Sequence, residues 1–185
     1  AAKIPMLEPS NSEECKEFTR RAFALSEEFD APFFIRLSTR VSHSQSLVEL
    51  KDAENAELKP YEKNIPKNVM MPAMAKGRHV AVEKRMEKLR EFAEGCEFNR
   101  IERNGSRIGI IAAGTTYVYA KEALGDKADY LKLGLVYPLP DKMIRDFAAS
   151  VDELWCLEEL DPVIETHIRS LGIDVKGKEH FTLLG

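Results

Sequence analysis

Three short stretches of this 185-residue chain place reactive or charged side chains where a strand is expected to end. They are "AAGTT" (residues 112–116), "LEELDP" (157–162) and "STRVSHS" (38–44). In open parallel sheets, ligands bind outside the carboxyl ends of the strands, so each stretch is a candidate site. Each also has a purely structural interpretation.

The first stretch has only a loose likeness to a phosphate-binding turn. Gly109 and Gly114 have the glycine spacing of a P-loop, but Thr115 stands where that motif needs lysine. The G-x-G-x-x-G pattern of dinucleotide-binding proteins is absent. A tight turn at Gly114 with Thr115 as a helix N-cap is the simpler interpretation.

The second stretch is acidic. Glu158, Glu159 and Asp161 could form a carboxyl pair for acid–base catalysis. Carboxylates also stabilise helix N-termini, and Asp161 followed by Pro162 fits an N-cap with proline in the first helical position. We favour the capping role.

The third stretch combines Arg40 with Ser42 and His43. A guanidinium beside hydroxyl and imidazole groups suits an anionic group such as a carboxylate. A solvated polar loop is the alternative. We predict that Arg40, Ser42 and His43 bind substrate, and we assign a catalytic step to no residue.

The composition excludes several classes of protein. Hydrophobic residues make up 44% and charged residues 31%, which is typical of globular domains. A net charge of −4 disfavours nucleic acid, and no apolar run reaches the roughly 20 residues of a membrane span. Three scattered cysteines and four scattered histidines fit neither a disulfide framework nor a metal site. We therefore expect a cytoplasmic protein with no nucleic acid, membrane or metal bound to this chain.

The elements of the first part are irregularly spaced. Ser10 and Glu13 fit a capping box that begins a helix ending at Asp30. A buried strand is expected at 33–39, and 41–50 could add a second. Residues 51–76 contain Pro60, Pro66 and Pro72 among charges, which indicates an extended linker before a helix at 78–94.

The second part alternates regularly. Strands are predicted at 107–113, 129–136 and 151–157, and helices at 115–124, 140–149 and 162–171; "IDVKG" could close the sheet. This order predicts a small three-layer α/β domain with a parallel sheet. Because the strand at 33–39 lacks obvious neighbours, residues 1–50 are interpreted as the tail of another α/β domain. The predicted boundaries are 1–50, 51–104 and 105–185.

Four segments in order resemble one family. "KIPMLEPSNSEE", "APFFIRLSTRVSHSQSLVEL", "GIIAAGTTYVYAKEAL" and "LKLGLVYPLP" are similar to an internal segment of the indolepyruvate:ferredoxin oxidoreductase alpha subunit, a 2-oxoacid:ferredoxin oxidoreductase. The resemblance covers essentially the whole chain, and "KIPMLEPS" and "TRVSHS" are its most specific parts. It implies that 1–50 ends a pyrimidine-binding thiamine diphosphate domain and that 105–185 is a transketolase C-terminal-like domain.

The resemblance also implies a reaction. The family decarboxylates aryl 2-oxoacids with thiamine diphosphate, transfers the acyl group to coenzyme A and passes electrons through iron–sulfur clusters to ferredoxin. It works with a beta subunit in anaerobes and archaea. Its thiamine-activating glutamate is expected before Ala1, and its diphosphate- and Mg-binding domain and cysteine-rich segment after Gly185. We therefore expect no cofactor on this fragment and no activity from it alone.

Two other functions stay open from the sequence. One is a non-catalytic subunit-association or scaffolding domain of a transketolase-like or other 2-oxoacid oxidoreductase. The other is a small-molecule-binding α/β regulator that uses "AAGTT" for a phosphate. An exposed strand edge at "FFIRL" would also favour pairing with another chain and a homodimer.

Overall fold

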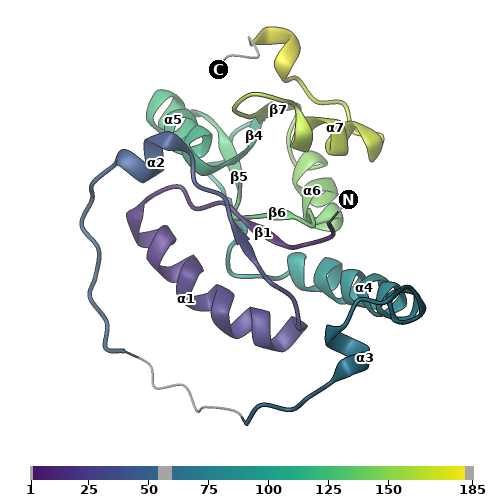
Figure 1. The fold of residues 1–185 in the computed structure, drawn as a ribbon. Helices are drawn as coiled ribbons and strands as arrows, with labels where there is room; N and C mark the ends of the chain where they lie inside the picture. The colour runs from purple at the N-terminus through teal and green to yellow at the C-terminus, as the bar shows by residue number, and fades with distance from the viewer. Residues whose placement is uncertain (1, 54–59, 182–185) are drawn as a thin grey trace.

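Two sheets and seven α-helices form the fold in a computed structural model that describes residues 2–53 and 60–181 (Figure 1). The larger sheet has the order β3-β5-β4-β7, and the smaller has the order β2-β1-β6. The bounds of the larger sheet's strands are β3 Arg100–Glu102, β4 Ile108–Ala113, β5 Asp129–Leu133 and β7 Glu153–Leu157. Those of the smaller are β1 Met6–Leu7, β2 Phe34–Ile35 and β6 Leu135–Tyr137.

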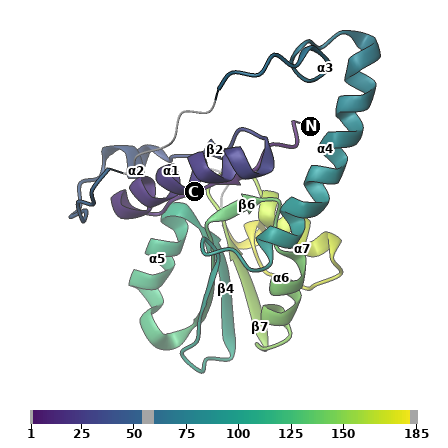
Figure 2. The same ribbon diagram turned by 90° about the horizontal axis from the view of Figure 1, so that it is seen from below.

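The larger sheet forms the centre of a three-layer α/β/α unit, as predicted. Strand β4 pairs in parallel with both β5 and β7, and only β3 at the edge runs antiparallel. Helix α5 (Gly114–Leu124) covers one face, while α6 (Asp141–Ala148) and α7 (Val163–Ser170) cover the other, as Figure 2 shows. The predicted closing segment makes one bridge, between Trp155 and Lys176.

The alternation of side chains along β4 explains the two cores. Ile111 and Ala113 face α6 and α7, whereas Ile110 and Ala112 face the α5 side with Tyr117. Both faces are buried, as expected for a strand in the middle of a parallel sheet.

The predicted strand at 129–136 is in fact two strands in different sheets. Gly134 separates them, and a Cβ atom at this position would lie 2.4 Å from the Phe98 carbonyl oxygen. The Asn99 side chain accepts hydrogen bonds from the backbone N–H groups of Gly134 and Leu135, each at 3.0 Å. This amide replaces a neighbouring strand where the chain passes from the larger sheet to the smaller one.

The smaller sheet joins the beginning of the chain to this point. β1 pairs in parallel with β2 and antiparallel with β6. Helix α1 (Ser12–Phe29) packs beside it, with Phe18, Ala22 and Leu25 buried against Phe98 and Leu135. The predicted cap of this helix is wrong. Asn11, rather than Ser10, is the N-cap and accepts from the Glu14 N–H at 2.9 Å.

The predicted strand at 33–39 and the possible strand at 41–50 were wrong in length and type. Only Phe34–Ile35 is extended in a sheet, and Phe34 and Leu37 are about half exposed. Ser38 caps a short helix, α2 (Thr39–His43), by accepting from the Val41 N–H. This local cap ends the strand before the polar segment.

Helices α3 (Ile65–Asn68) and α4 (Pro72–Ala93) follow. Helix α4 begins at Pro72, six residues before the predicted start, since proline suits the first helical turn. Its last turns bury Met86, Leu89 and Ala93, and its first half projects from the sheets in Figure 2. Residues 54–59 of the predicted linker, Ala1 of the first predicted domain and 182–185 of the last lie outside the described residues. The three domain boundaries stay predictions.

Candidate functional site

A cleft of about 500 Å³ opens at the carboxyl ends of β4 and β7, where the smaller sheet meets the larger one. It brings together residues of "AAGTT" and "LEELDP", two of the three stretches considered above, with residues of β1 and β2. Its polar and charged lining residues are Lys3, Glu8, Arg36, Thr116, Tyr137, Glu158, Glu159 and Asp161. Its apolar lining includes Ile4, Met6, Phe34, Val136 and Leu160.

Glu8 lies at the base of this cleft against the turn into α5. Its side chain is largely buried and accepts a 2.8 Å hydrogen bond from Arg36 Nη1. Burial raises the pKa of Glu8 above its usual value, while Arg36 acts in the opposite direction. Gly114 has a φ of +53°, and a Cβ there would lie 2.7 Å from Glu8 Oε1. Glycine is therefore needed both for the turn and for room beside this carboxyl group.

The start of α5 is unsuited to a phosphate. Glu8 packs on Gly114, and Thr115 Oγ1 donates to Glu159 at 2.7 Å. Thr116 Oγ1 bonds back to the Ala113 carbonyl at 2.6 Å. Two carboxylates thus lie where a phosphate would approach, and like charges repel. The turn interpretation holds for Gly114, although Ala113 and not Thr115 is the N-cap.

Glu158 caps α7 in place of the predicted Asp161. Its two carboxylate oxygens accept from the backbone N–H groups of Ile164 and Glu165 at 2.7 and 2.9 Å. The N-cap residue is Pro162, one position after the predicted Asp161. The side chain that caps the helix belongs to Glu158 and not to Asp161. Burial raises the pKa of Glu158, and the two N–H donors oppose the rise. The capping interpretation of the acidic stretch is thus supported for Glu158 rather than Asp161.

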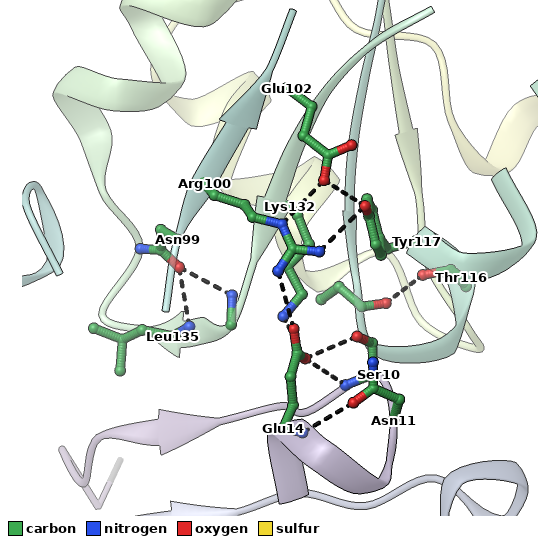
Figure 3. A network of polar contacts seen from close by, with 12 residues as sticks. Ser10, Asn11, Glu14, Asn99, Arg100, Glu102, Thr116, Tyr117, Lys132 and Leu135 are labelled. Carbon is green, nitrogen blue, oxygen red and sulfur yellow. Dashed lines mark hydrogen bonds and ion pairs between the residues drawn. The ribbon is translucent and has the colours of Figure 1, made fainter. Parts of the chain in front are cut away.

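A network of hydrogen bonds and ion pairs connects α1 to the larger sheet (Figure 3). Lys132, on β5, is fully buried and donates to Glu14 Oε2 at 2.6 Å. Its ammonium also lies 5.0 Å from the centroid of the Phe18 ring. The same Glu14 oxygen accepts from the Ser10 N–H and hydroxyl, each at 2.8 Å. A buried charge is thereby paired and hydrogen-bonded, which is the condition for tolerating it.

The pKa values of Lys132 and Glu14 are both lowered, but by different causes. Burial lowers the pKa of Lys132, and Glu14 partly restores it. Burial would raise the pKa of Glu14, but Lys132 and Ser10 outweigh it and the net shift is downward. Each group thus favours the charged form of the other, and the contact is an ion pair.

The network continues from Glu14 through Arg100 to helix α5. Arg100 contacts Glu14 at 3.1 Å and donates to the Tyr117 hydroxyl at 3.2 Å, and its guanidinium lies over the Tyr117 ring. Tyr117 donates to Glu102, which also pairs with Lys121 at 2.8 Å. Burial would raise the pKa of Glu102, but Lys121, Tyr117 and Arg100 lower it to about 2. Each charged group of this network has a partner within the chain. We therefore interpret the network as structural.

The predicted substrate-binding residues lie away from the cleft. Arg40, Ser42 and His43 are exposed on α2, and none of them lines it. The Arg40 guanidinium lies over the Tyr119 ring of α5 at 5.5 Å, and Ser42 Oγ donates to the Ser38 carbonyl at 3.0 Å. Their role in substrate binding stays a prediction.

The described residues do not fit a Mg–diphosphate group. The cleft is lined by four carboxylates and two basic side chains, and Arg36 is already paired with Glu8. Within 2–53 and 60–181, no group of three or more His, Cys, Asp or Glu side chains could hold a metal ion. In the same residues, no helix is long and apolar enough to cross a membrane.

Comparison with known proteins gives consistent relatives. No family model matches the chain. Indolepyruvate oxidoreductase subunit IorA of Archaeoglobus fulgidus is 34% identical over 184 residues, covering 96% of this chain and 30% of that protein. The subunit IorA of Methanothermobacter thermautotrophicus is 35% identical over 194 residues (98% and 31%), and that of Thermococcus kodakarensis is 35% identical over 185 residues (94% and 28%).

A solved structure shares the fold. The 2-oxoglutarate:ferredoxin oxidoreductase from Magnetococcus marinus, determined with 2-oxoglutarate, coenzyme A and succinyl-CoA bound, matches with a TM-score of 0.60 at 16% identity. The match covers 94% of this chain and 38% of that one. The chain therefore spans about a third of the length of the proteins that it matches. The resemblance expected from the motifs is confirmed: this chain is a relative of one segment of the indolepyruvate oxidoreductase subunit IorA, with a fold found in 2-oxoacid:ferredoxin oxidoreductases.

Proposed function

We propose that this chain is a segment of a thiamine diphosphate-dependent oxidoreductase that oxidatively decarboxylates aryl 2-oxoacids, such as indolepyruvate, to acyl-CoA with ferredoxin as electron acceptor. The observation that supports this most is the sequence identity of 34–35% with three IorA subunits over 94–98% of the chain. The implied partners are a beta subunit, ferredoxin, coenzyme A and the 2-oxoacid. A cytoplasmic location is part of the proposal and fits three cysteines without disulfide spacing.

The proposed contribution of this segment is architectural. The cleft is acidic, and the described residues do not fit Mg–diphosphate, so thiamine diphosphate, Mg and the iron–sulfur clusters would be bound by other parts of the enzyme. The Glu14–Lys132 pair fixes α1 on the larger sheet and so holds the end of one α/β unit against the next. We expect no activity from this chain alone.

The test is an assay of the longer subunit that contains this region, purified with its partner subunit. With coenzyme A present, we expect indolepyruvate-dependent reduction of ferredoxin and formation of the acyl-CoA. Turnover of 2-oxoglutarate in place of indolepyruvate would contradict the aryl specificity. Absence of any 2-oxoacid-dependent reduction by a complex with intact iron–sulfur absorption would contradict the proposal as a whole.

The predicted role of Arg40 has its own test in the same assay. Replacing Arg40 by alanine would remove a charge-assisted hydrogen bond to a substrate carboxylate, which amounts to about 1.5–3 kcal/mol, or a KM higher by about tenfold or more. Arg107→Ala is the matched control, because Arg107 is exposed and pairs with Asp152. An unchanged KM in Arg40→Ala would remove Arg40 from the substrate site.

A subunit-association role is the second candidate. It is favoured by the open edge of β2, whose residues Phe34 and nearby Leu37 expose apolar surface. This role and the enzyme proposal are compatible, and a homodimer through the edge is one of its forms. Size measurement of the purified longer subunit at several concentrations tests the homodimer.

A further inference from the structure

Helix α2 lies against helix α5 (Figure 1). Ser38 caps the first turn of α2, and Val41 is buried, with 5% of its surface exposed. The Arg40 guanidinium lies 5.5 Å from the centroid of the Tyr119 ring on α5. Because a helix of five residues is unstable by itself, the cap and the contacts with α5 must hold α2 in place.

Arg40 lacks the partners that other arginines of this chain have. Arg36, four residues earlier, pairs with the Glu8 carboxylate at 2.8 Å. Within the part of the chain that the structure describes, Arg40 has neither a carboxylate partner nor a hydrogen bond, and its one such interaction is with the Tyr119 ring. The N–H donors of its guanidinium are therefore unused.

An aromatic ring attracts a guanidinium through the positive charge and needs no hydrogen-bond acceptor. The contact between Arg40 and Tyr119 thus restricts a long side chain and leaves its N–H donors available for a carboxylate. Restriction before binding lowers the conformational entropy that binding would otherwise cost. Tyr119 is 46% exposed, so the contact lies at the surface of the described residues.

We propose that Tyr119 is a positioning residue that holds Arg40 in the orientation in which it binds the carboxylate of the 2-oxoacid. Tyr119 acts through Arg40 and does not itself touch the substrate. The inference rests on the substrate-binding role that the proposed function gives to Arg40. It adds a residue from α5, in a part of the chain where the sequence motifs indicated only a turn and a helix.

Two replacements of Tyr119 in the longer subunit, purified with its partner subunit, test the proposal. Tyr119→Leu removes the ring, whereas Tyr119→Phe keeps the ring and removes only the hydroxyl group. A cation–π contact at an exposed site is weak, so Tyr119→Leu should raise the KM for the 2-oxoacid about two- to fivefold with kcat unchanged. Tyr119→Phe should have the wild-type KM. Tyr61→Leu is the matched control, because Tyr61 is 85% exposed and makes no ring contact among the described residues.

A double variant tests whether Tyr119 acts through Arg40. Arg40→Ala/Tyr119→Leu should have the same KM as Arg40→Ala, because the ring has nothing left to position. Two KM effects that multiply would overturn the proposal. So would an unchanged KM in Tyr119→Leu, an equal rise in Tyr119→Leu and Tyr119→Phe, or a loss confined to kcat.

Hydrogen exchange measures the same contact without activity. The Ser42 N–H bonds to the Ser38 carbonyl at 3.0 Å, so exchange of the α2 amides reports how firmly this helix is held. In the ligand-free subunit, Tyr119→Leu should speed this exchange about two- to fivefold, and Tyr119→Phe should leave it unchanged. Equal exchange in Tyr119→Leu and wild type would overturn the proposal.

The two measurements separate this inference from the proposed reaction. Exchange rates as expected in a subunit that oxidises no 2-oxoacid would contradict the proposed reaction and leave the contact between Tyr119 and Arg40 intact. Full activity with equal exchange rates in Tyr119→Leu and wild type would do the reverse.

Discussion

The buried Lys132–Glu14 ion pair makes a quantitative prediction about stability. Replacing Lys132 by methionine keeps a side chain of similar length but leaves the Glu14 carboxylate, which is only 13% exposed, without its closest partner. Breaking a buried pair by removing one member costs about 3–5 kcal/mol. Glu14 retains Ser10 at 2.8 Å and Arg100 at 3.1 Å, so we expect a loss of unfolding free energy at the low end, about 3 kcal/mol.

The measurement is urea unfolding of the wild-type and variant proteins at pH 7. A loss of about 3 kcal/mol corresponds to a melting temperature lower by about 6–12 °C in a protein of this size. Lys142→Met is the matched control, because the Lys142–Asp146 pair is exposed and surface ion pairs contribute little to stability. The double variant Glu14→Gln/Lys132→Met should cost less than the sum of the two single changes, because it removes the stranded charge.

The reasoning would be refuted by two results. One is a Lys132→Met variant whose loss of stability is no greater than that of Lys142→Met. The other is additivity of the Glu14 and Lys132 changes within about 0.5 kcal/mol, since residues that contact each other and share a buried charge should be coupled.

Three further predictions concern single residues. Gly134→Ala should destabilise the protein by more than 2 kcal/mol in the same urea assay, because its Cβ would lie 2.4 Å from a backbone oxygen; Gly172→Ala, with open space around it and a φ of +77°, should cost about 1 kcal/mol. An equal loss in both would contradict this. Glu102 has a folded-state pKa of about 2 against a usual value of 4.5, so its contribution is complete above pH 4.5 and is lost as the pH falls toward 2. Glu102→Gln should therefore flatten the fall of the urea midpoint over that window, and an unchanged slope would exclude Glu102 as its source. Glu158→Ala should cost about 1–2 kcal/mol through loss of the α7 cap, whereas Asp161→Ala should cost less than about 0.5 kcal/mol; the reverse order would restore the sequence-based cap.

The regular half of the fold was predictable from the sequence, and the irregular half was not. Strand β4 and helices α5, α6 and α7 lie within one or two residues of their predicted positions, because strand and helix patterns alternate there with clear glycine and proline boundaries. Strand β1 is two residues long between prolines, and β3 is three residues long. Segments this short show no hydrophobic periodicity. They are recognised as strands only by their pairing with residues far away in the sequence.

The candidate site was predictable only in part. Strand ends were expected to gather, and the ends of β4 and β7 do line one cleft. Glu8 and Arg36 were not identified, since nothing local in the sequence says that β1 and β2 approach β4. Lys132 offered a usable signal: a lysine inside the apolar run "YLKLGL" must have a buried partner, although the sequence does not say that the partner is Glu14. Arg40, Ser42 and His43 were placed after a strand end, but their segment forms a helix once Ser38 caps it.

The smaller sheet combines strands that are synthesised at very different times. Ile35 of β2 and Leu135, which pairs with Leu7 of β1, are one hundred residues apart in the chain. At a synthesis rate of about 5–20 residues per second, the ribosome needs roughly 5–20 s to produce the last strand of this sheet after the first two. During that interval, the apolar face of α1 has no Leu135 to pack against, and for nearly all of it Glu14 has no Lys132. The first 50 residues therefore gain the packing of Leu135 and the Lys132 ion pair only after the C-terminal unit has been synthesised.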